Sequence, residues 1–276
     1  MNLPICLLVD NGSLRSEAIL SHRRVAQRLS VATQFEVLPV GLLHSHKIAP
    51  YQLNGTKAET IENFLASERG QSETELLILP LFLGPSRGVT EWLVEKLDAW
   101  KESATGRSYR VLDCLHSDSD SRLAMALNSE INELLIRESL LTPRVAMVDH
   151  GTPILEVNRV REEVGRMLFK ILSAGILGFS TCSRERRGGD RYSFNEPLLK
   201  TLLLKWGQEG SRDVVVALFF LLPGRHAGKN GDIDEICDEA TAMFPQMKIY
   251  QTKPLGEHEI VFSILKEKLE SAKSSK

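Results

Sequence analysis

The sequence predicts an α/β protein made of two similar three-layer αβα domains with parallel sheets, related by internal duplication. A repeat carries this prediction, because residues 9–13 (VDNGS) return as residues 148–152 (VDHGT), 139 positions later. Residues 81–88 (LFLGPSRG) return as residues 219–226 (FFLLPGRH), 138 positions later. We therefore expect an amino-terminal copy in residues 1–141 and a carboxyl-terminal copy in residues 142–276.

Four short apolar runs are typical of strands buried on both faces, because they are rich in Val, Leu and Ile and do not alternate with polar residues. These runs are residues 5–9, 76–83, 145–148 and 214–222. A further strand is expected to end near Cys182. Pro80 interrupts the second run, and we expect a bulge or an early strand end there, because proline cannot donate to a sheet ladder.

Helices are predicted between the strands. Apolar residues recur at three- and four-residue spacing from Val157 to Leu172, with Thr152 expected as the cap and Pro153 as the first helical residue. Less regular helices are expected at residues 15–29, 58–65, 90–100, 121–137, 195–206, 233–243 and 259–271. Strands that alternate with helices in this way indicate parallel sheets with helices on both faces.

Composition narrows the class of protein. With 276 residues, 42% of them apolar, the chain can bury two cores, and its formal charge of −2 does not favour a nucleic-acid partner. No signal peptide or membrane span is expected in residues 1–10, so we predict a cytoplasmic protein without membrane contact. A homodimer stays open. Free buried thiols in a reducing compartment are expected for the four widely spaced cysteines Cys6, Cys114, Cys182 and Cys237.

The two copies differ most informatively at two histidines. His150 and His226 stand where the first copy has Asn11 and Gly88. Each follows a predicted strand, and ligands of open parallel sheets bind beyond the carboxyl ends of the strands, so we expect both rings to face one cleft. Imidazole binds cobalt, iron, nickel or zinc and accepts protons near neutral pH. Surface or hydrogen-bonding roles are expected instead for His22, His44 and His116.

The loop at residues 183–191 (SRERRGGDR) permits two interpretations. It is either a solvated hinge or a site where arginines beside Glu185 grip an anionic ligand through charge-assisted bonds. The repeat shift of 139 places His46 opposite Glu185. Whether His46 or Glu196 joins the site stays open.

Two further pairs correspond between the copies. Arg87 and Arg225 each follow a turn, where they either bind a ligand or tie the turn carbonyls. Asp10 and Asp149 are expected to be structural, because an aspartate before a turn commonly accepts backbone N–H bonds.

Two motifs connect the chain with a known family: His150-Gly151-Thr152 at the end of a strand, and residues 219–226 followed by Asp232. With them the chain resembles the sirohydrochlorin chelatases, the small cobalto- and ferrochelatases of cobalamin and sirohaem synthesis. The resemblance implies a chelatase-type α/β fold and a lyase-type enzyme without an organic cofactor. It would insert Co²⁺ or Fe²⁺, with Ni²⁺ also open, into a tetrapyrrole held between the halves.

The resemblance also implies site residues. His150 and His226 would be metal ligands and catalytic residues, and Glu185 would complete the metal site or relay protons. A basic rim would orient the carboxylates of sirohydrochlorin; its candidate residues are Arg184, Arg186, Arg187, Arg191, Arg225 and Lys229. The first copy, which lacks both histidines, would form a substrate wall or a degenerate half.

Two alternative functions stay open. A metal- or tetrapyrrole-binding protein that delivers its cargo without catalysing insertion would fit the degenerate first copy. A nucleotide-binding α/β protein has weaker support, because neither Gly-x-Gly-x-x-Gly nor Gly-x-x-x-x-Gly-Lys-Ser occurs. The absence of a Gly-x-Ser-x-Gly elbow disfavours a serine hydrolase.

Overall fold

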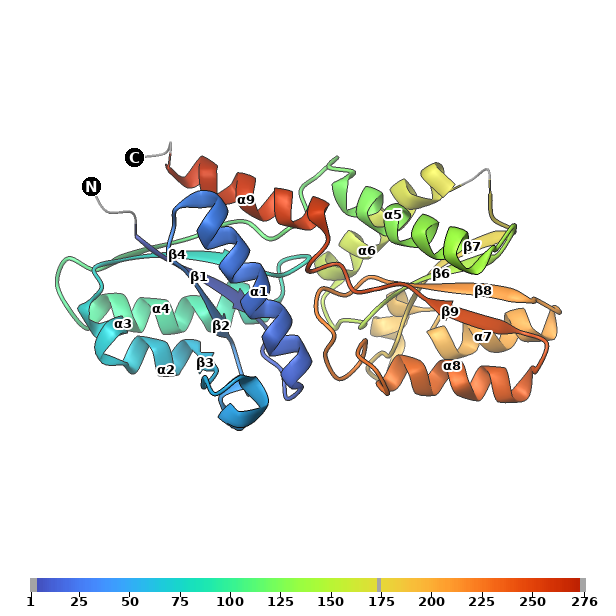
Figure 1. The fold of residues 1–276 in the computed structure, drawn as a ribbon, viewed down its shortest axis with the longest axis horizontal. Coiled ribbons are helices and arrows are strands. Elements are labelled where there is room, and N and C mark those ends of the chain that lie inside the picture. Colours follow the sequence, from blue (N-terminus) through green and yellow to red (C-terminus); the bar gives the residue numbers. More distant parts are fainter. Residues whose placement is uncertain (1–3, 173–174, 274–276) are drawn as a thin grey trace. The chain divides into compact units, whose positions relative to one another are not determined.

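The computed structural model describes residues 4–172 and 175–273 and contains two parallel sheets (Figure 1). The chain forms two compact units: unit 1 comprises Met1–Ser117 and Val261–Lys276, and unit 2 comprises Asp118–Ile260. Among the described helices, none is both long and apolar enough to cross a lipid bilayer.

Unit 1 contains a five-stranded sheet in the order β3-β2-β1-β4-β5. Its strands are β1 (Ile5–Asp10), β2 (Val37–Gly41), β3 (Glu59–Thr60), β4 (Glu75–Pro80) and β5 (Ser108–Val111). Its helices are α1 (Ser16–Thr33), α2 (Ile61–Ala66), α3 (Glu68–Ser72), α4 (Leu93–Glu102) and most of α9 (Glu259–Lys273). One face of the sheet carries α1 and α9, and the other carries α2, α3 and α4 (Figure 1). Alternate residues of β1 therefore serve opposite cores: Leu7 and Val9 pack in the cluster that contains Phe64 and Trp100.

Unit 2 contains a four-stranded sheet in the order β7-β6-β8-β9. Its strands are β6 (Arg144–Asp149), β7 (Gly178–Ser183), β8 (Asp213–Leu218) and β9 (Lys248–Gln251), and its helices are α5 (Arg122–Glu138), α6 (Leu155–Leu172), α7 (Leu199–Gln208) and α8 (Asp232–Met243). Helices α5 and α6 cover one face, and α7 and α8 cover the other (Figure 1). On the α7/α8 face, Val148 and Val216 pack with Leu203 and Trp206.

The predicted fold class of two parallel-sheet αβα domains is confirmed, and both sheets share one connectivity. In unit 1, β1 lies between β2 and β4. In unit 2, β6 lies in the same way between β7 and β8. The expected strands at the centre of each sheet are present. The sequence patterns missed β2, β3, β5 and β9; β3 has only two residues, and β5 and β9 are partly exposed, so they lack a continuous buried run.

The compact units differ from the predicted halves 1–141 and 142–276. Helix α5 precedes the second copy in the chain but packs on α6 and β8 in unit 2, and α9 from Val261 onward belongs to unit 1. Each half thus contributes its last helix to the other unit. A repeat in sequence records the order of strands and helices, whereas only through-space packing decides which core the last helix joins.

Two local expectations have opposite outcomes. Strand β4 ends at Pro80, so the early strand end is confirmed; the last pair with β5 lies two residues earlier, at Ile78. The expected cap of α6 is wrong. The helix begins at Leu155, and the Thr152 hydroxyl instead accepts the N–H of Ile154 at 3.1 Å.

Candidate metal site

The structure brings His150 and His226 together within unit 2. They follow β6 and β8, which are neighbouring parallel strands, so their carboxyl ends open on the same edge of the sheet. The ring centroids lie 4.4 Å apart with an interplanar angle of 62°. The side chain of His150 is 49% exposed and that of His226 is 25% exposed. An ion or ligand can therefore reach the imidazole pair from solvent.

His226 is held by a carboxylate. Its Nδ1 lies 2.6 Å from Oδ2 of Asp232, the first residue of α8. Partial burial raises the pKa of Asp232, but the hydrogen bond and charge of His226, with the charge of Arg184, outweigh it and hold that pKa below its ordinary value. An ionised carboxylate has no proton to donate, so Nδ1 is the donor. Nε2 of His226 then carries the free lone pair that a metal ion requires.

The protonation state of His226 favours metal binding. Partial burial lowers its pKa below the ordinary 6.5; the hydrogen bond and charge of Asp232 raise the pKa, but burial, together with His150 and the charge of Arg184, outweighs them. The ring is therefore neutral at neutral pH. Neutral imidazole is a good ligand for cobalt, iron and zinc.

Glu185 lies beside the pair, but Arg184 holds it. Its Oε1 is 3.7 Å from Nδ1 of His150 and 2.5 Å from Nη2 of Arg184. Glu185 forms no closed three-donor cluster with both rings. Its backbone N–H donates to the carbonyl oxygen of His150 at 3.3 Å, which ties the two loops together. Coordination by Glu185 would require that the carboxylate exchange Arg184 for the ion.

Gly151 allows the loop after β6 to pass close to the backbone of Glu185, in the loop after β7. Its φ is +87°, and a Cβ at this position would lie 1.9 Å from the carbonyl oxygen of Glu185. Gly12, its counterpart in unit 1, has a φ of +80° and would place a Cβ 1.7 Å from the carbonyl oxygen of Leu43. The same close crossing therefore occurs in both copies, although only one of them carries the histidines.

We expect Gly151→Ala and Gly12→Ala each to destabilise their own unit by about 2 kcal/mol or more, because a left-handed alanine and a backbone clash add together. Amide hydrogen exchange resolves the two units separately. Only Gly151→Ala should also abolish the nuclear Overhauser contact between the rings of His150 and His226. If that contact survives in Gly151→Ala, or is lost equally in Gly12→Ala, Gly151 does not position the pair.

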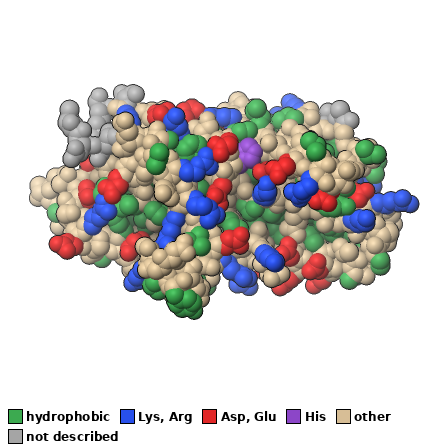
Figure 2. Space-filling view, viewed as in Figure 1, with side chains coloured by type: hydrophobic (Ala, Val, Ile, Leu, Met, Phe, Trp, Pro, Cys, Tyr) green, Lys and Arg blue, Asp and Glu red, His purple; other side chains and the backbone are tan. Residues whose placement is uncertain are grey.

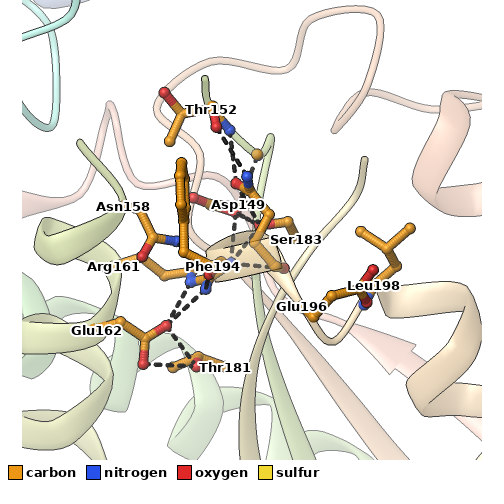
Figure 3. A network of polar contacts seen from close by, with 12 residues as sticks. Asp149, Thr152, Asn158, Arg161, Glu162, Thr181, Ser183, Phe194, Glu196 and Leu198 are labelled. Carbon is orange, nitrogen blue, oxygen red and sulfur yellow. Dashed lines mark hydrogen bonds and ion pairs between the residues drawn. The ribbon is translucent and has the colours of Figure 1, made fainter. Parts of the chain in front are cut away.

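A buried polar network anchors the His150 loop (Figure 3). Arg161 on α6 is 1% exposed; it donates to Oγ of Ser183, lies 3.5 Å from Oδ1 of Asp149, and donates to the carbonyl oxygen of Phe194 at 3.0 Å. Ser183 Oγ in turn donates to Asp149 Oδ1 at 2.7 Å. Asn195 clamps the backbone after the histidine by bonding both the N–H and the carbonyl oxygen of Thr152 at 2.9 Å.

One part of this network could be predicted from the sequence and another could not. Asp149 accepts the N–H of Gly151 at 3.0 Å, which confirms its structural role. Arg161 was missed, although the repeat contains a signal for it. Residue 22 lies 139 positions earlier, and His22 is buried with its Nδ1 3.4 Å from Oδ1 of Asp10. Each copy therefore places a basic residue of the following helix against its strand-end aspartate.

The expected pairing of His46 with Glu185 is wrong. Leu43 donates its N–H to the carbonyl oxygen of Asn11 at 3.3 Å, as Glu185 does to His150, so Leu43 is the true counterpart. The register shifts because 31 positions separate Asp10 from its partner Gly41, whereas 34 separate Asp149 from Ser183. The correspondence of Gly88 with His226 keeps its shift of 138, since Leu81 and Phe219 make equivalent backbone bonds to the first strand of each copy.

The predicted basic rim separates into two groups. Arg184 is 11% exposed and paired with Glu185 and Asp232, and Arg186 donates to Oε1 of Glu196 at 2.6 Å. Glu196 is therefore engaged away from the histidines. The exposed members are Arg187, Arg191, Arg225 and Lys229. Basic and acidic side chains are interspersed over the face that Figure 2 shows.

The fold and the site together define a two-domain parallel α/β protein in which one domain carries a convergent imidazole pair at its strand ends. Residues 190–272 match the family model CbiX. Over 126 residues the chain is 27% identical to the sirohydrochlorin ferrochelatase, chloroplastic, of Arabidopsis thaliana. That alignment covers 46% of the chain and 51% of the relative, so it spans about half the length of this curated protein.

Solved structures share the whole fold. SirB from Bacillus subtilis with Fe³⁺ has a TM-score of 0.71 and 14% identity, with 99% of this chain and 98% of that chain covered. CbiX, described as the terminal enzyme of siroheme biosynthesis in denitrifying bacteria, has a TM-score of 0.58 and 14% identity, with 97% and 99% covered. The resemblance to the sirohydrochlorin chelatases that the motifs indicated is confirmed.

Proposed function

We propose that this protein inserts a divalent metal ion, cobalt or ferrous iron, into sirohydrochlorin in cobalamin or sirohaem biosynthesis. The contact between His150 and His226 carries the proposal, with ring centroids 4.4 Å apart at adjacent strand ends. It is supported by the name of the plant ferrochelatase and by the Bacillus subtilis SirB structures, which were obtained with Fe³⁺ and with cobalt. Buried free thiols at Cys6, Cys182 and Cys237 fit a reducing compartment, which we propose is the cytoplasm.

In this proposal the metal ion is a substrate that the site holds and then releases. Nε2 of His226 and a ring nitrogen of His150 bind the ion, because two imidazole nitrogens compete with water for it without trapping it in a closed ligand shell. The partly exposed position of both rings leaves coordination positions open toward the macrocycle. The ion can then exchange protein nitrogens for pyrrole nitrogens.

Insertion also requires a path for protons. One divalent ion replaces two pyrrole N–H protons, so the charge of the macrocycle is unchanged and two protons must reach solvent. In this proposal Glu185 is the relay; the role is supported by its carboxylate, which lies 3.7 Å from His150 Nδ1 and is 55% exposed. The exposed cations Arg187, Arg191, Arg225 and Lys229 would orient the carboxylates of the substrate.

The proposal is tested by mixing purified protein with sirohydrochlorin and Co²⁺, or with Fe²⁺ under anaerobic conditions, and following the tetrapyrrole absorption spectrum. We expect the protein to accelerate insertion above the rate with metal alone and to turn over many times. Binding of one equivalent without turnover would instead identify a delivery protein. If the protein neither binds the metal or tetrapyrrole nor accelerates insertion, and a dinucleotide raises its melting temperature, both the chelatase and the delivery protein are overturned.

A further inference from the structure

We infer that Arg184 and Asp232 form a positioning pair for the imidazole site. Asp232 fixes the Nδ1–H tautomer of His226, and Arg184 links this carboxylate to that of Glu185. The role as a metal site rests on the proposed function, whereas the tautomer can be measured in the protein without metal.

Asp232 is placed rigidly against His226. Its carboxylate lies 2.6 Å from Nδ1, and the backbone around it is bonded to the loop that carries the histidine. The N–H of Ile233 donates to the carbonyl oxygen of His226 at 3.1 Å, and that of Asp232 to the carbonyl oxygen of Arg225 at 3.4 Å. These bonds connect the start of α8 to the histidine loop and hold the carboxylate against the ring.

The pairing has a direct consequence for metal binding. The proton of a neutral imidazole can sit on either nitrogen, and a metal ion binds only the nitrogen without it. A carboxylate at Nδ1 keeps the proton of the neutral ring there, leaves Nε2 as the nitrogen with the lone pair and makes it more basic. Loss of such a partner typically weakens metal affinity 10–100-fold.

Arg184 connects the two carboxylates. Its Nη1 lies 2.7 Å from Oδ2 of Asp232, and its Nη2 lies 2.5 Å from Oε1 of Glu185. The planar guanidinium holds the two groups at a fixed separation, which a flexible ammonium does not. Because the side chain is only 11% exposed and both of its terminal nitrogens are engaged, Arg184 acts inside the site, whereas the sequence placed it on the substrate rim.

Nitrogen-15 NMR of the metal-free protein at neutral pH tests the first half of this inference. In the native protein we expect the ring nitrogens of His226 to show the Nδ1–H tautomer. Asp232→Ala should convert a large part of the population to Nε2–H, and Asp232→Glu should restore Nδ1–H. Asp238→Ala is the matched control, because Asp238 is an exposed carboxylate on the same helix. An Nε2–H ring in the native protein, or an unchanged tautomer in Asp232→Ala, would overturn the role of Asp232.

Cobalt titration calorimetry tests the second half. We expect Co²⁺ affinity to fall 10–100-fold in Asp232→Ala and about tenfold in Arg184→Gln, while Arg212→Gln, an exposed control in unit 2, matches the native protein. Native-like affinity in Arg184→Gln would overturn the role of Arg184. If the native protein binds no cobalt but Asp232→Ala still shifts the tautomer, the proposed function fails and the positioning of His226 by Asp232 stands.

Discussion

Removing either ring of the imidazole pair, in His150→Ala or His226→Ala, should reduce the acceleration of cobalt insertion at least ~100-fold, equivalent to about 2.7 kcal/mol of barrier. In the proposed site each ring supplies one of the two imidazole lone pairs that bind the ion. Loss of an outer partner alone typically weakens metal affinity 10–100-fold, so loss of a ligand should cost at least as much. The double variant should be no worse than the more damaged single variant if the rings act as one unit.

The rate of spectral change at saturating sirohydrochlorin measures this loss, and cobalt calorimetry shows whether binding or insertion fails. His44→Ala is the control, because His44 is an exposed residue of unit 1. Circular dichroism should show that all variants are folded, since both site histidines are partly exposed. Full acceleration in both single variants would show that the imidazole pair takes no part in metal insertion.

Replacing the buried guanidinium of unit 2, in Arg161→Leu, should destabilise that unit by about 3–5 kcal/mol. The substitution leaves the carboxylate of Asp149, which is 8% exposed, without its counter-charge. It also removes one of the two donors to the carbonyl oxygen of Phe194, the other being the side-chain amide of Asn158. Arg159→Leu, on the exposed face of the same helix, should change stability by no more than about 0.5 kcal/mol.

A double-mutant cycle separates the two causes. In an Asp149→Asn background, Arg161→Leu should cost much less than in the native protein, because no uncompensated charge is left behind. Amide hydrogen exchange in β6 and β7 reports unit 2, and exchange in β1 provides an internal reference in unit 1. An equal cost in both backgrounds would show that packing, and not charge, makes Arg161 necessary.

Much of the fold and the centre of the candidate site could be predicted from the sequence. A central parallel strand is covered on both faces, so β1, β4, β6 and β8 appear as short apolar runs. A duplication preserves strand order, and strand ends of neighbouring parallel strands meet. The approach of His150 to His226 follows from these two facts alone.

The contacts around that centre could not be predicted, because they depend on distances that sequence spacing does not contain. A connection longer by three positions replaces His46 with Leu43 as the counterpart of Glu185. Arg184 stands in an arginine-rich loop and is expected at the surface, but its side chain is enclosed between two carboxylates. The short strands β5 and β9 are partly exposed, so no apolar run marks them.

The sequence by itself determined the class of fold, the duplication and the identity of the two histidines, since buried periodicity and repeated motifs are properties of the linear chain. Tertiary structure alone decided which helix completes which unit, that Asp232 pairs with Nδ1 of His226, and that Arg161 supports the loop beneath the site. The physical reason is that burial and ion pairing depend on which groups approach through space. Helix α5 packs on α6 and β8, Asp232 pairs with His226, and Asp149 pairs with Arg161, and no local sequence pattern predicts these contacts.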